Sequence, residues 1–158
     1  MPGEALLRLA EVAPVIVAAL FIGAFLLFAL GMQPVGKGEG RTIVIVDDDT
    51  DVRRALRRLI EDRTVHRVVG EASDGAEGLA VIESLTPDAV VIDVKLPVVD
   101  GIEATQRIKE RHPYIKVIGF SSADDDATGA ILRRAGASKT LVKGDSPDEI
   151  VDALIEVV

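Results

Sequence analysis

The sequence contains no cysteine, and only two histidines, His66 and His112, occur among its 158 residues. The absence of cysteine excludes a disulfide-bonded scaffold, a cysteine-ligated zinc site, an iron–sulfur cluster and catalysis by a thiol. Aromatic residues make up 3% of the chain, which leaves few side chains for stacking on bases or sugars. The net charge of −8, without a long basic tract, argues against direct binding to nucleic acid.

The mean hydropathy of +0.30 is high for a soluble protein, and one segment accounts for it. Residues 12–32 carry no charge. At about 1.5 Å per residue, a helix of this length spans roughly 31 Å, close to the hydrocarbon core of a bilayer. We predict one transmembrane helix over residues 12–32, after an N-terminal tail of residues 1–11. A cleaved signal peptide, a buried core helix and a misassigned reading frame remain alternatives.

The apolar segment is followed by residues 33–41, QPVGKGEGR, in which one proline and three glycines interrupt any helix. This composition predicts a flexible linker. Lys37 and Arg41 follow the apolar segment, whereas only Arg8 precedes it. The positive-inside rule therefore weakly favours a cytoplasmic location for residues 42–158.

Short apolar runs alternate with helical patterns from residue 42 to residue 158. The runs are rich in Val and Ile and continuous, as in strands buried on both faces. They are Thr42–Val46, Val65–Glu71, Ala89–Asp93, Lys116–Ser121 and Thr140–Lys143. Apolar stripes at helical spacing follow each run, such as Val52, Ala55, Leu56, Leu59 and Ile60 after the first, Ala76, Leu79 and Ala80 after the second, and Ala127, Ala130 and Ile131 after the fourth. Short connections require right-handed crossovers, so we predict an α/β fold, a doubly wound five-stranded parallel sheet.

Polar side chains stand where the predicted strands end, and ligand sites of doubly wound folds lie at that edge of the sheet. Asp47, Asp48 and Asp49 follow the first strand, Asp93 ends the third, Ser121 the fourth and Lys143 the fifth. If the first strand lies beside the third, the carboxylates converge and require protonation or a hard cation such as Mg²⁺. The cation and Lys143 would hold a phosphoryl group, and a carboxylate would accept it as the nucleophile.

Each of these residues also has a structural interpretation. Asp49 or Thr50 is expected to cap the first helix, and Asp93 could end its strand as a turn residue. The arginines of the first helix (Arg53, Arg54, Arg57 and Arg58) form a basic face that is by default solvated. Contact with an acidic kinase partner or with anionic lipid is the functional alternative for this face.

Four stretches of the chain resemble the receiver domain of two-component response regulators, of the NarL/FixJ type. They are IVIVDDDTDVRRAL (43–56), AVVIDVKLPVVDGIEA (89–104), KVIGFSSAD (116–124) and ASKTLVKGDSPDEI (137–150). The resemblance covers residues 41–158. It implies a flavodoxin-like sheet with strand order 2-1-3-4-5.

The resemblance also implies a role for each residue of the pocket. Asp93 matches the phosphoacceptor, and Asp47 and Asp48 match the acidic pair that holds Mg²⁺ together with Asp93. Lys95 matches the position whose backbone carbonyl binds the metal. Ser121 matches the switch hydroxyl, and Lys143 matches the lysine that pairs with phosphate.

Two positions depart from the common family pattern. Thr140 stands where many receivers have Tyr or Phe, so the usual aromatic rotamer switch is in doubt. Gly144 follows the lysine where proline is common. A cis peptide at a non-proline bond costs about 3 kcal/mol, so we expect the Lys143–Gly144 bond to be trans.

The sequence therefore predicts a phosphoacceptor signalling domain rather than an enzyme, tethered to the inner membrane and exposed to the cytoplasm. Its partners are expected to be a histidine kinase or phosphotransfer protein, an output partner of unknown kind and, as an option, a second copy. No effector domain is apparent within the chain. An interaction module that is not phosphorylated and a haloacid-dehalogenase-type phosphohydrolase, with Asp47 as nucleophile, remain alternatives.

Overall fold

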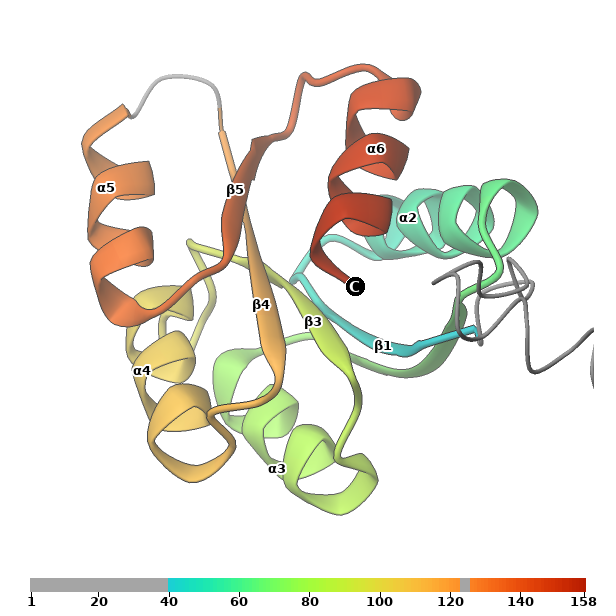
Figure 1. The fold of residues 1–158 in the computed structure, drawn as a ribbon. Coiled ribbons are helices and arrows are strands. Elements are labelled where there is room, and N and C mark those ends of the chain that lie inside the picture. The colour runs from blue at the N-terminus through green and yellow to red at the C-terminus, as the bar shows by residue number, and fades with distance from the viewer. Residues whose placement is uncertain (1–39, 123–125) are drawn as a thin grey trace, which may run out of the picture. The chain divides into compact units, whose positions relative to one another are not determined.

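The computed structural model describes residues 40–122 and 126–158, in which five strands form one parallel sheet (Figure 1). The strands pair in the order β2-β1-β3-β4-β5, which confirms the predicted sheet. Their bounds are β1 (Thr42–Val46), β2 (Arg67–Ala72), β3 (Ala89–Asp93), β4 (Lys116–Ser121) and β5 (Lys139–Val142). Within these two described ranges, no helix is long and apolar enough to cross a bilayer. The predicted transmembrane segment, residues 12–32, lies outside the described residues.

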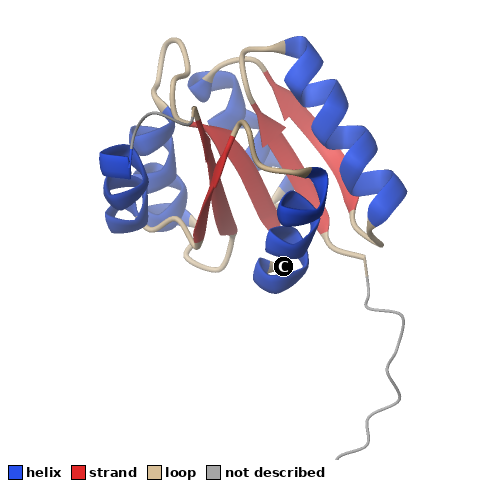
Figure 2. Ribbon diagram, turned by 90° about the horizontal axis from the view of Figure 1, so that it is seen from above, coloured by secondary structure: helices blue, strands red, loops and turns tan. Residues whose placement is uncertain are grey.

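Helices cover both faces of the sheet (Figure 2). They are α2 (Thr50–Arg63), α3 (Gly75–Leu85), α4 (Gly101–Arg111), α5 (Asp126–Ala135) and α6 (Pro147–Val157). Side chains of α2 and α6 pack on one face, and those of α3, α4 and α5 pack on the other. The alternation of strands with helices in the sequence thus gives three layers.

Strand β1 supplies both cores. Ile43 and Ile45 point toward α2 and α6, Val44 and Val46 point to the opposite face, and all four are fully buried. This is why the strand is continuously apolar in sequence. Residues 39–158 form one compact unit, and the cores on both sides of its sheet are those that an independently folding domain needs.

Local capping follows the sequence closely. Asp49 caps α2 by accepting hydrogen bonds from the backbone N–H groups of Asp51 and Val52, at 2.8 and 3.3 Å. Ser146 and Glu149 form the predicted capping box at α6, with Pro147 at the first position. All peptide bonds among the described residues are trans, including Lys143–Gly144.

The predicted inward faces of two helices are wrong in part. In α5 the sequence stripe points to Ala127, Ala130 and Ile131, but Ile131 is 45% exposed and Leu132 is fully buried. Leu132 fits because it packs over Gly119, where a Cβ would lie 2.6 Å from its Cδ1. The α5 helix therefore turns a different face toward the sheet, one that opposes a glycine of β4.

In α3, Ala76 and Ala80 are exposed, and Gly78 and Ile82 face the sheet. A Cβ on Gly78 would lie 2.9 Å from Cγ1 of Val46, so the absence of a side chain allows the helix to approach the strand. Hydropathy patterns overlook such contacts, because glycine contributes no apolar side chain.

The edge strands also shift by one or two residues from the predicted runs. Strand β2 begins at Arg67 rather than Val65, which is exposed, and β5 covers 139–142 rather than 140–143. Edge strands are half-exposed, so their hydrophobicity marks their ends poorly.

We expect Gly101→Ala to lower the free energy of unfolding of residues 39–158 by about 1–3 kcal/mol, the usual cost of overpacking. A Cβ at this position would lie 2.0 Å from the backbone carbonyl oxygen of Asp93, so β3 and α4 would have to separate. Urea unfolding measures the change. Gly144→Ala is the matched control, because nothing lies within 4 Å of its Cβ position and we expect a change below about 0.5 kcal/mol. Equal effects of the two substitutions would contradict this account.

Candidate functional site

Carboxylates converge at the carboxyl ends of β1 and β3, which are neighbours in the sheet. Asp47 directly follows β1 and is 1% exposed, and Asp93 is the last residue of β3 and is 5% exposed. Asp48 is exposed at the rim of the same cluster. One carboxylate oxygen from each of the three residues lies within 4.8 Å of the others. The structure thus brings the predicted acidic residues together.

Lys143, just after β5, bridges the two buried carboxylates. Its Nζ lies 2.8 Å from Oδ2 of Asp93, to which it donates a hydrogen bond, and 2.9 Å from Oδ2 of Asp47. The backbone N–H of Lys143 donates to the carbonyl oxygen of Ser121 at 2.7 Å, which fixes the lysine at the site. The Nζ also lies 5.9 Å above the ring centre of Phe120, within the range of a cation–π contact.

The protonation equilibria reflect this burial. Burial raises the pKa of Asp47 above its usual value, and the opposing effects of Lys143 and of the Asp49 N–H do not cancel it. Burial also lowers the pKa of Lys143, but its close contacts with the carboxylates of Asp93 and Asp47 outweigh that effect and leave the pKa raised. Lys143 therefore stays charged. Ionising Asp47 in this buried position lowers the stability of the folded state.

The loop after Asp93 is held against the site by close packing at Gly75 and Gly101. The Lys95 N–H donates to Oδ1 of Asp93 at 3.3 Å, and the side chain of Lys95 is exposed. A Cβ on Gly75, at the start of α3, would lie 1.9 Å from the carbonyl oxygen of Val99. Between these points Val98 has a φ of 68°, an unfavourable conformation for a β-branched residue. Close packing on both sides thus fixes the loop that follows the candidate phosphoacceptor.

Two polar residues flank the acidic cluster on β4 and β5. Ser121 is buried at the end of β4, one residue beyond Phe120, which pairs with Asp93 in the sheet. Thr140 of β5 is partly buried, and its Oγ1 has no hydrogen-bond partner among the described residues. The Thr140 side chain faces α5, because a Cβ on Gly129 would lie 3.7 Å from its methyl carbon.

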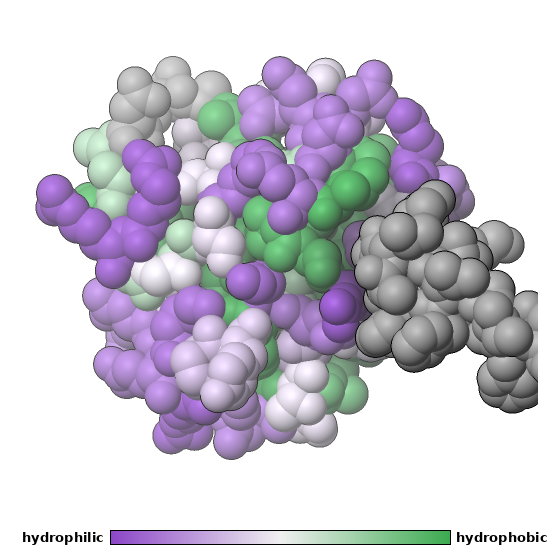
Figure 3. All heavy atoms as spheres, viewed as in Figure 1, coloured by the Kyte–Doolittle hydropathy of each residue, from purple (hydrophilic) through white to green (hydrophobic). Residues whose placement is uncertain are grey.

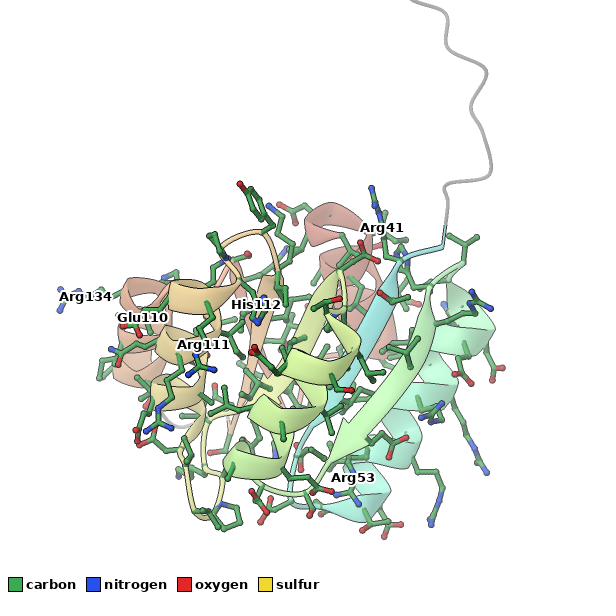
Figure 4. All side chains as sticks on the ribbon, turned by 90° about the horizontal axis from the view of Figure 1, so that it is seen from below. Arg41, Arg53, Glu110, Arg111, His112 and Arg134 are labelled. Carbon is green, nitrogen blue, oxygen red and sulfur yellow. The ribbon has the colours of Figure 1, made fainter. Side chains whose placement is uncertain are left out.

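Arg53 also belongs to the site, although the sequence places it among the arginines of α2 and favours a solvated basic face for them. Its Nη1 donates to the carbonyl oxygen of Asp47 at 2.6 Å, and its Nε pairs with Glu71 of β2 at 3.3 Å. Glu71 also pairs with Arg57 at 2.5 Å. Figure 4 shows Arg53 at the carboxyl end of the sheet, opposite Arg41. Arg53 thus holds the backbone of Asp47 in place from α2. Its contact with Glu71 is what sets it apart from a solvated arginine, and that contact joins residues 18 positions apart in the sequence.

The residues present fit a hard divalent cation. Oδ2 of Asp47 is buried and accepts no hydrogen bond within the described part of the chain, and Lys143 is its only close cation there. An oxygen-only cluster of three carboxylates is the donor set that Mg²⁺ prefers. Asp47, Asp48 and Asp93 would hold the ion.

Comparison with known proteins identifies the class of domain. The family model of the response regulator receiver domain matches residues 43–155, and the chain belongs to this family. It is 37% identical over 112 residues to the response regulator GacA of Pseudomonas viridiflava, covering 71% of this chain and 52% of that protein. It is 30% identical over 116 residues to the nitrate/nitrite response regulator protein NarL of Escherichia coli, covering 73% and 54%. The chain thus spans about half the length of the curated relatives it matches.

Solved structures agree with this assignment. A two-component response regulator of the LuxR family from an Aurantimonas species superposes with a TM-score of 0.70 at 37% identity, covering 74% of this chain and 84% of that one. The receiver domain of the putative response regulator NarL from Mycobacterium tuberculosis gives a TM-score of 0.71 at 29% identity, covering 75% and 95%. The fold and the site therefore define a signalling receiver with NarL/LuxR-type neighbours.

In metal-free buffer at pH 7, we expect Asp47→Asn to raise the free energy of unfolding of residues 39–158 by an amount of order 1 kcal/mol. The reason is the raised pKa of Asp47, since ionising this buried carboxyl costs stability. The advantage should vanish as the pH falls below the usual carboxyl range, where the carboxyl is protonated in both states. Urea unfolding with a chelator at pH 7 and at about pH 3, below the usual aspartate pKa, measures the difference between Asp47→Asn and the unaltered protein. A loss of stability at pH 7 would contradict the prediction.

Proposed function

We propose that this chain is a phosphoacceptor of a two-component phosphorelay, phosphorylated on Asp93 in a Mg²⁺-dependent reaction. The observation that carries the proposal is the placement of Asp93, a buried carboxylate whose Oδ2 lies 2.8 Å from Lys143 Nζ and whose neighbours are two further carboxylates. The donor is a histidine kinase or a phosphotransfer protein. The domain then acts as a signalling switch rather than as an enzyme on other substrates.

In this mechanism, a carboxylate oxygen of Asp93 attacks the phosphorus of a phosphohistidine. The new O–P bond forms as the P–N bond breaks, and the imidazole leaves with the electron pair and takes up a proton. Lys143 places its charge beside the attacking carboxylate, where it stabilises the oxygens of the transferring group. Bound Mg²⁺ supplies further positive charge for the same oxygens. The Ser121 hydroxyl donates a hydrogen bond to a phosphoryl oxygen once the phosphoryl group is attached to Asp93.

The docking of the donor is supported by an apolar cleft beside Lys143. The cleft has a volume of about 280 Å³ and lies between α2 and α6, with Leu56, Leu59, Phe120 and Ile150 in its lining. Figure 3 shows hydrophobic side chains gathered around α6 on a face that is otherwise mostly hydrophilic. An amphipathic helix that carries the phosphohistidine fits this cleft, because its apolar side would fill the groove while its histidine reaches the acidic site.

The phosphoacceptor proposal predicts a gain of one phosphoryl group. After treatment of residues 39–158 with acetyl phosphate, intact-mass spectrometry should show one adduct with Mg²⁺ and none with a chelator. Asp93→Asn should abolish the adduct. The Asp47→Asn variant keeps the acceptor and should reduce the yield at a given Mg²⁺ concentration, since it removes a metal ligand.

The same measurement separates the alternatives. No adduct on the unaltered protein would favour an interaction module that is not phosphorylated. An adduct that survives Asp93→Asn and is lost in Asp47→Asn would favour the haloacid-dehalogenase chemistry. The hydrogen bond that Oδ1 of Asp47 accepts from the Asp49 N–H at 2.9 Å weighs against Asp47 as a nucleophile, because it occupies one of the two carboxylate oxygens.

We further propose that residues 12–32 tether the domain to the inner membrane, with the receiver in the cytoplasm. The uncharged length of this segment and the positive charges that follow it support the proposal. The full chain should sediment with membranes and resist extraction by carbonate and high salt. Deletion of residues 12–32 should release it to the soluble fraction. Release of the full chain by carbonate would contradict the tether.

A further inference from the structure

The two ends of the sheet carry opposite kinds of charge. The carboxyl ends of the strands carry the acidic cluster, whereas four of the five strands have a basic residue at or just before their first residue. These are Arg41 before β1, Arg67 in β2, Lys116 in β4 and Lys139 in β5. Basic residues in the last turns of α2, α4 and α5 are explained by the helix dipole. Strands have only small dipoles, so the strand residues have no such explanation.

Part of this positive charge is not neutralised. Arg67 and Lys116 are exposed and have no ion-pair partner within 4.0 Å in the described part of the chain. Burial lowers the pKa of Lys109, and the charge of Lys116 lowers it further, so like charges act on one another here. Arg41 and Lys139 pair with Asp88 and Glu156, respectively.

The only tyrosine of the chain lies at the same end. Tyr114 is 90% exposed in the turn between α4 and β4, directly before Ile115 and Lys116. It borders an open cavity of about 460 Å³ that Pro87, Asp88, Arg111 and Pro113 also line. An amphipathic ring with no packing of its own, beside exposed cations, is typical of side chains at the level of lipid headgroups.

The chain also enters the domain at this end, where residues 40 and 41 are firmly held. Arg41 donates its N–H to Nδ1 of His66 at 3.1 Å and accepts a hydrogen bond from the Arg67 N–H at 2.9 Å. A Cβ on Gly40 would lie 2.0 Å from the carbonyl oxygen of Val65. Figure 4 shows Arg41 at the far end of the sheet from Arg53. Only residues 33–39 then separate the domain from residue 32, a reach of at most about 25 Å.

We propose that the amino-end surface, formed by Arg41, Arg67, Tyr114, Lys116 and Lys139, lies against anionic lipid headgroups. This inference rests on the proposed tether, which brings this end of the sheet to the bilayer. The acidic end, with Asp93, then faces away from the membrane toward the donor. Among the described residues, the unpaired charges of this surface are those of Arg67 and Lys116. The arginines of α2 are excluded by position, because Arg53 holds the backbone of Asp47 at the opposite, acidic end of the sheet.

The chain has neither tryptophan nor cysteine. A single introduced tryptophan can therefore serve as the fluorescent reporter, and a single added cysteine as the point of attachment. A cysteine added before Glu39 couples residues 39–158 to a maleimide lipid, independently of residues 1–38. Tyr114→Trp reports on the amino-end surface, and Asp51→Trp reports on the acidic end. Quenching of each tryptophan by lipids brominated near the headgroup is then measured in vesicles of phosphatidylcholine with and without phosphatidylglycerol.

We expect strong quenching at position 114 with phosphatidylglycerol, and little at position 51 or in neutral vesicles. The double variant Lys116→Gln with Arg67→Gln should lower the equilibrium constant for contact between this surface and the anionic bilayer by about thirtyfold. The reason is that each basic residue near an anionic surface contributes roughly one kcal/mol. Arg54→Gln with Arg58→Gln, on exposed positions of α2, is the matched control and should leave quenching unchanged.

Equal quenching at positions 114 and 51, or equal loss in the two double variants, would overturn the proposal. Absence of quenching at both positions would also overturn the proposal and would indicate a protein partner for this surface instead. The full chain, reconstituted separately, tests the tether. If the full chain fails to insert while the lipid-coupled domain still shows quenching at position 114, the proposed tether is contradicted, but the proposed contact of the amino-end surface with lipid still holds.

Discussion

The structure of the site depends on a single lysine between two buried carboxylates. Asp47 and Asp93 end adjacent parallel strands, so backbone pairing alone forces their side chains together. Two such charges about 4 Å apart repel by about 4 kcal/mol at an effective dielectric of 20. Lys143, which directly follows β5, offsets this repulsion, although β3 and β4 lie between β5 and β1 in the sheet. Under the proposed function, this arrangement would keep the Asp93 carboxylate ready for a cation and a phosphoryl group.

The parallel sheet gives the molecule two chemically distinct ends. Because every strand runs in the same direction, all carboxyl ends meet at one edge and all amino ends at the other. Helix N-termini also lie at the acidic end, and Asp49, Asp100 and Ser146 cap them there. The chain enters the domain at Arg41, so the length of the sheet separates this entry point from the acidic cluster.

Glycines mark where local patterns were insufficient. Gly78 and Gly119 allow a helix to approach a strand closely, and these contacts decide which faces of α3 and α5 point inward. Gly101 also allows α4 to approach the backbone of Asp93 closely. Arg53 was likewise assigned to solvent, although Glu71, 18 residues away, holds it beside Asp47. Each error concerns a partner distant in sequence.

The sequence by itself determined the order of strands and helices, the caps and the identities of the acidic residues, the hydroxyl and the lysine. These features depend on periodicity and on residues within a few positions of one another. Only the tertiary structure decided that Lys143 spans both carboxylates and that Arg53 supports the loop after β1. Such features depend on distances between segments far apart in the chain, which the packing of helices across the sheet sets and local sequence does not encode.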